Sequence, residues 1–262
     1  MDSNQHEDIP QQIANCDEHG EFMQKHVSVL GRVIKSRCPA CETERKAKEQ
    51  EISRKQEAMV SEMRMYDLLQ GALIPKRFSG KTFANYQVTL GNDRQRKAFA
   101  TCKDYADNYI EHHKAGRCLL LLGKPGTGKT HLAAAIAGQV MQVLGRQCVY
   151  RTVPGILQYI KASYDNATNY TEAEAYSSLV TCSLLVIDEI GATKQTEFEL
   201  SVLFTIINGR YERQLPTVIV SNLMPKELPD AMGERCVDRL REGGGIALVF
   251  DWESMRAEIG HD

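Results

Sequence analysis

Apolar residues over the last two thirds of the chain fall into short runs separated by segments with helical spacing. The runs predict five strands, at residues 117–122, 148–152, 183–188, 216–221 and 246–250. The segments predict helices at residues 93–113, 131–144, 154–164, 196–213 and 233–241. Strands that are apolar throughout and alternate with helices are typical of a parallel sheet covered on both faces. We therefore expect an α/β domain.

The first part of the chain has a different pattern. Residues 42–70 are highly charged and contain neither Gly nor Pro, which predicts a helix. Its apolar stripe is thin and consists of Ile52, Met59, Met63 and Tyr66. The Gly- and Pro-containing segment 71–80 predicts a boundary between a small domain, residues 1–72, and the α/β domain, residues 73–262. This stripe has two alternative roles: it docks on a partner protein, or it packs back on the larger domain. Composition does not decide between them, because Met is common both at interfaces and in cores.

Composition narrows the class of protein. The chain has 262 residues, of which 42% are hydrophobic and 25% charged, with a net charge of −2. This balance is ordinary for a globular protein and creates no general attraction to DNA or membranes. No apolar run approaches the roughly 20 residues that span a bilayer, and the polar N-terminus has no signal-peptide core. We expect a cytoplasmic protein without membrane contact, whose cysteines are metal ligands or buried apolar residues rather than disulfides.

Four residues near the N-terminus have the spacing of a metal site. Two residues separate Cys16 from His19, two separate Cys38 from Cys41, and 18 residues separate the two pairs. Two such pairs are typical of tetrahedral Zn²⁺ coordination, here with a ribbon-like pattern. The segment has too little apolar sequence to fold without a cross-link of this kind. His26 is the alternative ligand.

A glycine-rich stretch between a predicted strand and a predicted helix matches the phosphate-loop pattern G-x-x-x-x-G-K-[ST]. Its backbone N–H groups and the N-terminal end of the helix favour bound phosphates. The Lys129 amine would reach the β- and γ-phosphates, and the Thr130 hydroxyl would bind Mg²⁺. The predicted nucleotide-binding residues are Gly123, Lys124, Pro125, Gly126, Thr127, Gly128, Lys129, Thr130 and His131.

A second motif, Asp188-Glu189, stands at the end of an apolar strand. Asp188 would complete the Mg²⁺ shell, and Glu189 would orient and deprotonate the attacking water, since phosphoryl transfer depends on positioning and charge. Together with Lys129 of the phosphate loop, this pair predicts an enzyme that hydrolyses ATP.

Further motifs follow in a fixed order. The strand at 216–221 ends beside Asn222, the helix "GERCVDRLREGG" carries Arg235 and Arg239, and the tail "VFDWESMR" carries Arg256. This order is similar to that of the DnaC family of bacterial and phage helicase loaders, over about residues 74–262. The resemblance implies a P-loop AAA+ sheet flanked by helices, without a large lid domain, preceded here by the small zinc-binding and helical domain.

The resemblance also implies roles for single residues. Asn222 would sense the γ-phosphate, and Arg256 would contact the nucleotide. Arg239 would be the arginine finger for a neighbouring subunit, with Arg235 as the alternative, which implies self-assembly when bound to helicase. The positions that match a pore for single-stranded DNA are Lys161, Tyr164, Thr196 and Phe198. The alternative is that the tyrosines of this region, Tyr159 and Tyr164, simply pack their helix on the sheet.

These observations lead to one expected function and two alternatives. The resemblance implies an ATP-dependent loader that passes single-stranded DNA into the hexameric replicative helicase during initiation of DNA replication, with ATP, Mg²⁺ and Zn²⁺ as cofactors. An IstB-like transposition helper ATPase would act on duplex DNA instead. A zinc-stabilised adaptor would not hydrolyse ATP, and the intact Lys129, Asp188 and Glu189 argue against it.

Overall fold

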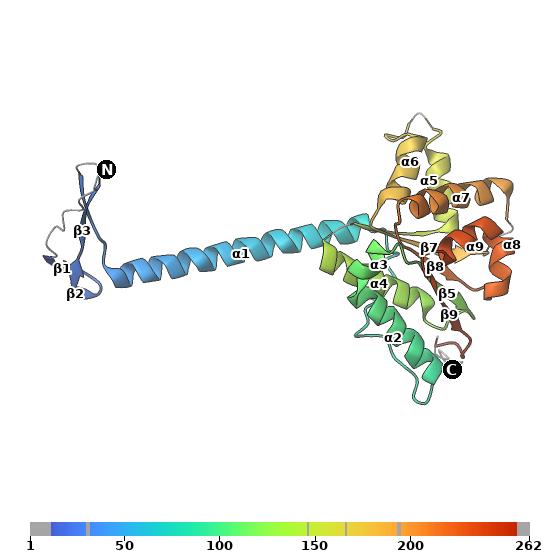
Figure 1. Cartoon of the computed structure of the whole chain (residues 1–262), viewed down its shortest axis with the longest axis horizontal. Helices are drawn as coiled ribbons and strands as arrows, with labels where there is room; N and C mark the ends of the chain where they lie inside the picture. The colour runs from blue at the N-terminus through green and yellow to red at the C-terminus, as the bar shows by residue number, and fades with distance from the viewer. Residues whose placement is uncertain (1–11, 30–31, 146, 166, 193–194, 256–262) are drawn as a thin grey trace, which may run out of the picture. The chain divides into compact units, whose positions relative to one another are not determined.

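The computed structural model describes residues 12–29, 32–145, 147–165, 167–192 and 195–255 (Figure 1). The chain divides into two compact units, Met1–Met63 and Arg64–Asp262. The division falls inside one long helix, whereas the sequence placed it at residues 72 and 73. The reason is that Met65 and Leu68 pack against the core of the second unit, and the Arg64 side chain donates to the Gly145 carbonyl oxygen at 2.8 Å.

The first unit contains two antiparallel hairpins and most of the long helix. The hairpins pair β1 (Gln12–Cys16) with β2 (Gly20–Gln24), and β3 (His26–Val29) with β4 (Arg32–Lys35). The helix α1 (Pro39–Gly71) begins three residues before the predicted start at residue 42. Proline fits the first turn of a helix, where its missing N–H needs no partner. As a result Cys41 lies in the first turn of α1.

The second unit is built on a parallel sheet with the strand order β6-β7-β8-β5-β9. Its strands are β5 (Leu119–Gly123), β6 (Cys148–Thr152), β7 (Leu184–Ile190), β8 (Thr217–Ser221) and β9 (Ile246–Phe250). All five coincide with the predicted strands, within a few residues at the ends. The α/β prediction is therefore confirmed.

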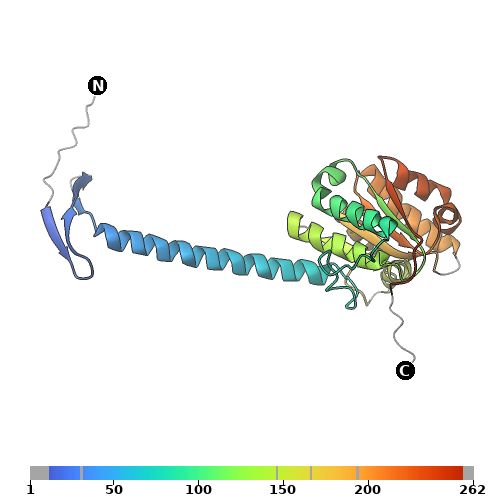
Figure 2. The ribbon, with the colours of Figure 1, turned by 90° about the horizontal axis from the view of Figure 1, so that it is seen from below.

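Helices cover both faces of this sheet (Figures 1 and 2). On one face lie α2 (Asp93–Asp107), α3 (Tyr109–Lys114) and α4 (Lys129–Leu144). On the other lie α5 (Val153–Ala162), α6 (Glu172–Thr181), α7 (Glu197–Glu212), α8 (Leu228–Met232) and α9 (Glu234–Arg241). Side chains alternate across β5, so Leu119 and Leu121 enter one core while Leu120 and Leu122 enter the other.

Two helical predictions needed correction. The single helix expected at 93–113 is divided at Asn108 into α2 and α3. The helix α6 was not predicted, although Thr171 and Glu174 form a capping box at its start, a recognisable signal. No helix in the described ranges has the length and apolar character needed to cross a membrane.

Candidate nucleotide and metal sites

The phosphate loop connects β5 to α4 and takes a conformation that requires glycine. Gly123, Gly126 and Gly128 have φ values of 119°, 77° and 92°, in the region that other residues adopt only with strain. A Cβ atom on Gly123 would lie 2.4 Å from the Phe250 carbonyl oxygen. Gly128 immediately precedes α4, so the N–H groups of the first helical turn, which a helix does not bond internally, belong to the loop. The backbone is therefore shaped for an anion.

The residues from Phe250 onward hold this loop in place. The bonds run from Lys124 N to Phe250 O (2.8 Å), from Met255 N to Gly126 O (2.7 Å) and from Trp252 Nε1 to Thr127 O (3.1 Å). The loop is thus supported by a segment more than a hundred residues away in the sequence.

The predicted phosphate-binding lysine and the predicted Mg²⁺ ligands lie behind the loop. The Lys129 side chain is only 4% exposed, and its amine donates to the carbonyl oxygens of Gly123 (2.8 Å) and Lys124 (2.6 Å). The Thr130 hydroxyl donates to Asp188 Oδ2 at 3.2 Å, so the two predicted Mg²⁺ ligands are adjacent. Hydroxyl and carboxylate oxygens are the donors that Mg²⁺ prefers.

Tyr150 is a contact of Asp188 that the sequence did not reveal. Its hydroxyl donates to Asp188 Oδ2 from the neighbouring strand β6. Burial and the adjacent carboxylate raise the pKa of Tyr150 well above its usual range, so the phenol remains a hydrogen-bond donor. This bond orients the Asp188 carboxylate.

Glu189 stands at an irregularity of β7. The register between β7 and β8 shifts between Ile187 and Ile190, and Glu189 has a φ of 63°. Its backbone N–H donates to Asp188 Oδ1 at 2.7 Å. A left-handed conformation costs a residue other than glycine about 1–2 kcal/mol, and such strain is typical of functional positions.

Lys129, Thr130, Asp188 and Glu189 line one cavity of about 670 Å³, a volume typical of ligand sites. It brings together residues of the phosphate loop, the Asp188-Glu189 pair and Asn222. The segment before α2 also lines it, through residues that the sequence did not assign: Pro75, Arg77, Phe78, Lys81, Asn85, Tyr86 and Gln87.

His131 joins that segment to the loop. Its Nε2 lies 2.8 Å from the Thr82 carbonyl oxygen, and its ring meets Tyr86 edge-on at 5.0 Å. Burial lowers the pKa of His131, so a neutral imidazole that donates from Nε2 is favoured.

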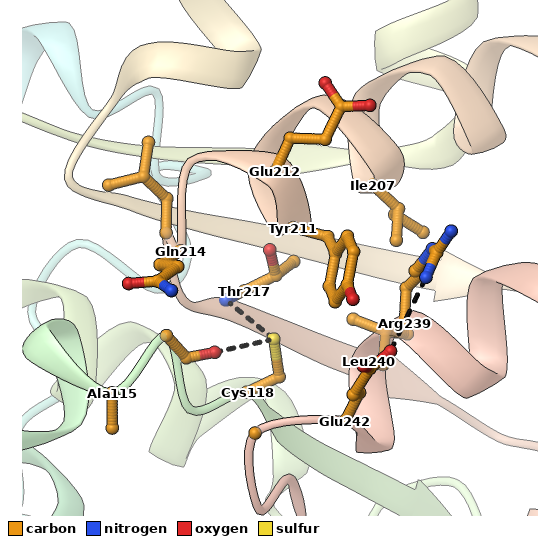
Figure 3. Close-up of a pocket in the computed structure, with 13 residues that line it drawn as sticks. Ala115, Cys118, Ile207, Tyr211, Glu212, Gln214, Thr217, Arg239, Leu240 and Glu242 are labelled. Carbon is orange, nitrogen blue, oxygen red and sulfur yellow. Dashed lines mark hydrogen bonds and ion pairs between the residues drawn. The ribbon is translucent and has the colours of Figure 1, made fainter.

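The predicted arginines lie elsewhere. Arg239 lines a separate pocket of about 330 Å³, where its guanidinium lies 4.2 Å from the Tyr211 ring centre and 3.5 Å from Glu242 Oε2 (Figure 3). Arg235 lines another pocket, beside Phe204 and Met232. Neither arginine is among the described residues that line the nucleotide cavity. Arg256 lies outside the described residues.

The four predicted DNA-contacting residues come together only in part. The Lys161 amine lies 5.3 Å from the Phe198 ring centre. Tyr164 is 56% exposed, and its hydroxyl donates to Glu172 at 3.0 Å. Thr196 caps α7, where its hydroxyl accepts the Glu199 N–H. Thr196 therefore has a structural role already.

Cys16, His19, Cys38 and Cys41 form a cluster in the first unit, with one ligand atom from each residue lying within 4.8 Å of the others. Cys41 Sγ lies 3.3 Å from His19 Nδ1 and 3.4 Å from Cys16 Sγ. Tetrahedral Zn²⁺ with bonds of about 2.3 Å separates its ligand atoms by about 3.8 Å, so this donor set fits zinc.

A second contact orients the histidine of this cluster. His19 Nε2 lies 3.0 Å from Glu44 Oε1, the arrangement that fixes the tautomer of a metal-binding imidazole. The alternative ligand His26 contacts Gln24 at 3.3 Å and is not part of the cluster.

Comparison with known proteins assigns residues 46–240 to the family described as IstB-like ATP binding protein. The replicative helicase loader DnaC of Buchnera aphidicola subsp. Acyrthosiphon pisum is 32% identical over 197 residues, which cover 75% of this chain and 78% of the relative. The replicative helicase loader DnaC of Escherichia coli K12 is 30% identical over 178 residues, which cover 68% of this chain and 70% of the relative.

Solved structures agree on the fold. A crystal structure of the DnaC helicase loader matches with a TM-score of 0.59 and 23% identity, over 67% of this chain and 99% of that chain. A crystal structure of DnaI matches with a TM-score of 0.57 and 22% identity, over 70% of this chain and 95% of that chain. The chain therefore belongs to the family of IstB-like ATP-binding proteins and to the DnaC family of helicase loaders.

Proposed function

We propose that this protein is a cytoplasmic ATPase that loads a hexameric replicative helicase onto single-stranded DNA during initiation of DNA replication. The observation that carries the proposal is the adjacency of Thr130 and Asp188 behind the phosphate loop, at 3.2 Å, in a chain of the DnaC family. It supports magnesium-assisted nucleotide binding, which a passive adaptor would not need.

The loop residues would bind the phosphates of ATP through their N–H groups, while the Lys129 amine exchanges its two carbonyl partners for phosphate oxygens. Thr130 and Asp188 would hold Mg²⁺, which neutralises phosphate charge when bound. Tyr150 keeps the Asp188 carboxylate aimed at Thr130. The contacts of Asp188 with Thr130 and Tyr150 are thus already present without nucleotide.

For hydrolysis, Glu189 would orient the attacking water and accept its proton, and Asn222 would hold the water or the γ-phosphate from the neighbouring strand end. Arg239 would complete the site of an adjacent subunit. Its position in a different pocket of its own chain supports this role in trans, because a finger that served its own nucleotide would line the nucleotide cavity. Self-assembly on the helicase would bring such junctions together.

The first unit would hold the helicase. Zn²⁺ at the cysteine–histidine cluster would tie the β1–β2 hairpin to the start of α1. The side chains of Ile52, Met59 and Met63 are 55%, 64% and 60% exposed. An exposed apolar stripe of this kind suits docking into a groove of a partner protein.

The second unit would contact single-stranded DNA through α5 and the start of α7. The pairing of Lys161 with Phe198 supports this part of the proposal, since a cation beside an aromatic ring suits both the phosphate and the base of a single strand. Tyr164 would add a second stacking surface, whereas Thr196 contributes chiefly through its cap.

The test combines the full chain with a purified bacterial replicative helicase and a single-stranded DNA circle. We expect co-purification with the helicase, and ATP-dependent transfer of the helicase onto the circle, measured by unwinding of an annealed strand. Lys129→Ala is the control that should retain helicase binding and lose loading. A chain that ignores the helicase but binds a transposase and duplex DNA would instead support the IstB-like helper.

A further inference from the structure

A second pocket, of about 370 Å³, lies at the edge of the sheet of the second unit. The edge strand β6 contributes Arg151, α5 contributes Tyr159, and the end of α6 contributes Ser178, Thr181 and Cys182. All ten residues that line it belong to the described part of the chain, and none of them is acidic. It shares no lining residue with the nucleotide cavity.

Arg151 is a half-buried cation in this pocket, and no described residue forms an ion pair with it. Its guanidinium lies 4.1 Å from the Tyr159 ring centre, and that ring also packs against Tyr170, with 4.8 Å between the two ring centres. Arg151 Nε is shielded from solvent and has no hydrogen-bond partner among the described residues. Buried charges in proteins are normally paired, because dehydration is costly otherwise.

A second guanidinium lies next to the pocket. Arg210 of α7 is 1% exposed and donates to the Cys182 carbonyl oxygen at 2.9 Å and to Cys182 Sγ at 3.3 Å. Cys182 itself lines the pocket. Every hydrogen-bond acceptor of Arg210 in the described residues is a carbonyl oxygen, a hydroxyl or this sulfur, so its charge is not neutralised either.

We propose that this pocket binds a phosphate dianion, with Arg151 as the direct donor and Arg210 as a buried source of positive charge. Two uncompensated positive charges border a space without carboxylates, and a group with a charge near −2 at neutral pH matches them better than a carboxylate or a phosphodiester. The fork of an arginine suits tetrahedral oxyanions.

Neighbouring polar groups suit the same ligand. The Ser178 and Thr181 hydroxyls now donate to carbonyl oxygens of their own helix, both at 2.8 Å, and a hydroxyl can rotate toward a new acceptor. Gln147 also lines the pocket, and its side-chain amide donates one N–H to the Gly71 carbonyl oxygen at 3.1 Å. The second N–H of this amide can donate to a bound ligand. The source of the phosphate is either free inorganic phosphate or the terminal phosphate of a nucleic acid.

The probe is radiolabelled inorganic phosphate, in equilibrium dialysis against the full chain carrying Lys129→Ala, so that the phosphate loop does not contribute. We expect about one bound equivalent. Arg151→Gln should weaken binding about tenfold or more, the loss expected for one charge-assisted contact, and Arg151→Lys should weaken it less. Arg241→Gln, at an exposed arginine of α9, is the matched control and should change nothing.

A further variant keeps the test independent of folding defects. Ser178→Glu supplies a permanent carboxylate to the pocket, so it should abolish phosphate binding and raise the melting temperature. The absence of bound phosphate, equal affinity after Arg151→Gln, or a lower melting temperature of Ser178→Glu would overturn the proposal.

Oligonucleotides identify the source. A 5′-phosphorylated and an unphosphorylated strand are each tested as competitors of labelled phosphate. If only the phosphorylated strand displaces the label, the ligand is the end of a nucleic acid; if neither strand displaces it, the ligand is free phosphate. Equal competition by an unphosphorylated strand would overturn the assignment to a dianion.

Discussion

Replacing Arg210 with methionine should destabilise the second unit severely, even though the residue lies outside the nucleotide cavity. Methionine fills a similar volume without a charge. Arg210 is almost completely buried at 1% exposure, and it joins α7 to the end of α6 and the start of β8. Its oxygen acceptors are the carbonyls of Leu179, Val180, Cys182 and Pro216 and the hydroxyl of Thr217.

The magnitude follows from these contacts. Each hydrogen bond from a charged donor contributes about 1.5–3 kcal/mol. The substitution removes the Arg210 hydrogen bond from each of five oxygen acceptors. Removing the guanidinium also removes its dehydration cost of several kcal/mol. We expect a net loss of about 3–5 kcal/mol in the free energy of unfolding, which is a large part of the roughly 5–15 kcal/mol of a typical domain.

The assay is urea unfolding of the full chain, followed by the fluorescence of Trp252. It is the only tryptophan in the sequence and belongs to the second unit, so its signal reports on that unit. Arg210→Lys retains the charge but has fewer donors and should lose less. Arg213→Met, at an exposed arginine one residue beyond α7, should stay within about 0.5 kcal/mol of the parent. A loss below about 1 kcal/mol for Arg210→Met would refute the reasoning.

Four further predictions concern the candidate sites. Lys129→Ala should abolish binding of a fluorescent ATP analogue, because the lost amine serves the β- and γ-phosphates; unchanged affinity would contradict the phosphate-loop assignment. Arg239→Ala should keep ATP affinity but lose roughly 10³-fold or more of DNA-stimulated hydrolysis, with partial recovery on mixing with Glu189→Gln subunits; parent-like rates would transfer the role to Arg235. The double variant Cys38→Ser, Cys41→Ser should bind far less than one equivalent of zinc by atomic absorption, since two of four ligands are lost; an undiminished zinc content would exclude this cluster. A chain that begins at residue 64 should remain folded and bind ATP without binding the helicase, because it keeps Met65 and Leu68 of the core but lacks Ile52, Met59 and Met63 of the exposed stripe; normal helicase binding would place the docking surface elsewhere.

The sequence predicts those parts of the fold whose signals are local. Each strand of the sheet is an apolar run that needs no knowledge of its neighbours, and the phosphate loop is a contiguous motif between two such elements. The prediction that Thr130 and Asp188 serve one Mg²⁺ agrees with their adjacency in the structure, because the carboxyl ends of parallel strands meet at one edge of a sheet.

Other parts depend on contacts that the sequence does not display. The hairpins of the first unit are short and partly exposed, so their residues lack a clear alternation. The sequence predicts residues 71–80 only as a domain boundary and assigns no role to residues 81–92. Irregular backbone acquires a role only through packing, as Tyr86 does where its hydroxyl donates to the Thr127 carbonyl oxygen of the loop. The sequence also gives no sign that Arg210 is buried, because its burial depends on carbonyl groups at the end of α6, far from it in the chain.

The support of the phosphate loop by residues 250–255 has a consequence for protein synthesis. A ribosome makes the loop first and reaches Met255 roughly 125 residues later, which takes about 6–25 s at ordinary elongation rates. During that interval β5 lacks its neighbour β9, and the loop lacks its bonds to Phe250, Trp252 and Met255. We therefore expect nascent chains to bind ATP poorly until β9 and these residues have emerged, which limits the amount of partly made, nucleotide-loaded protein.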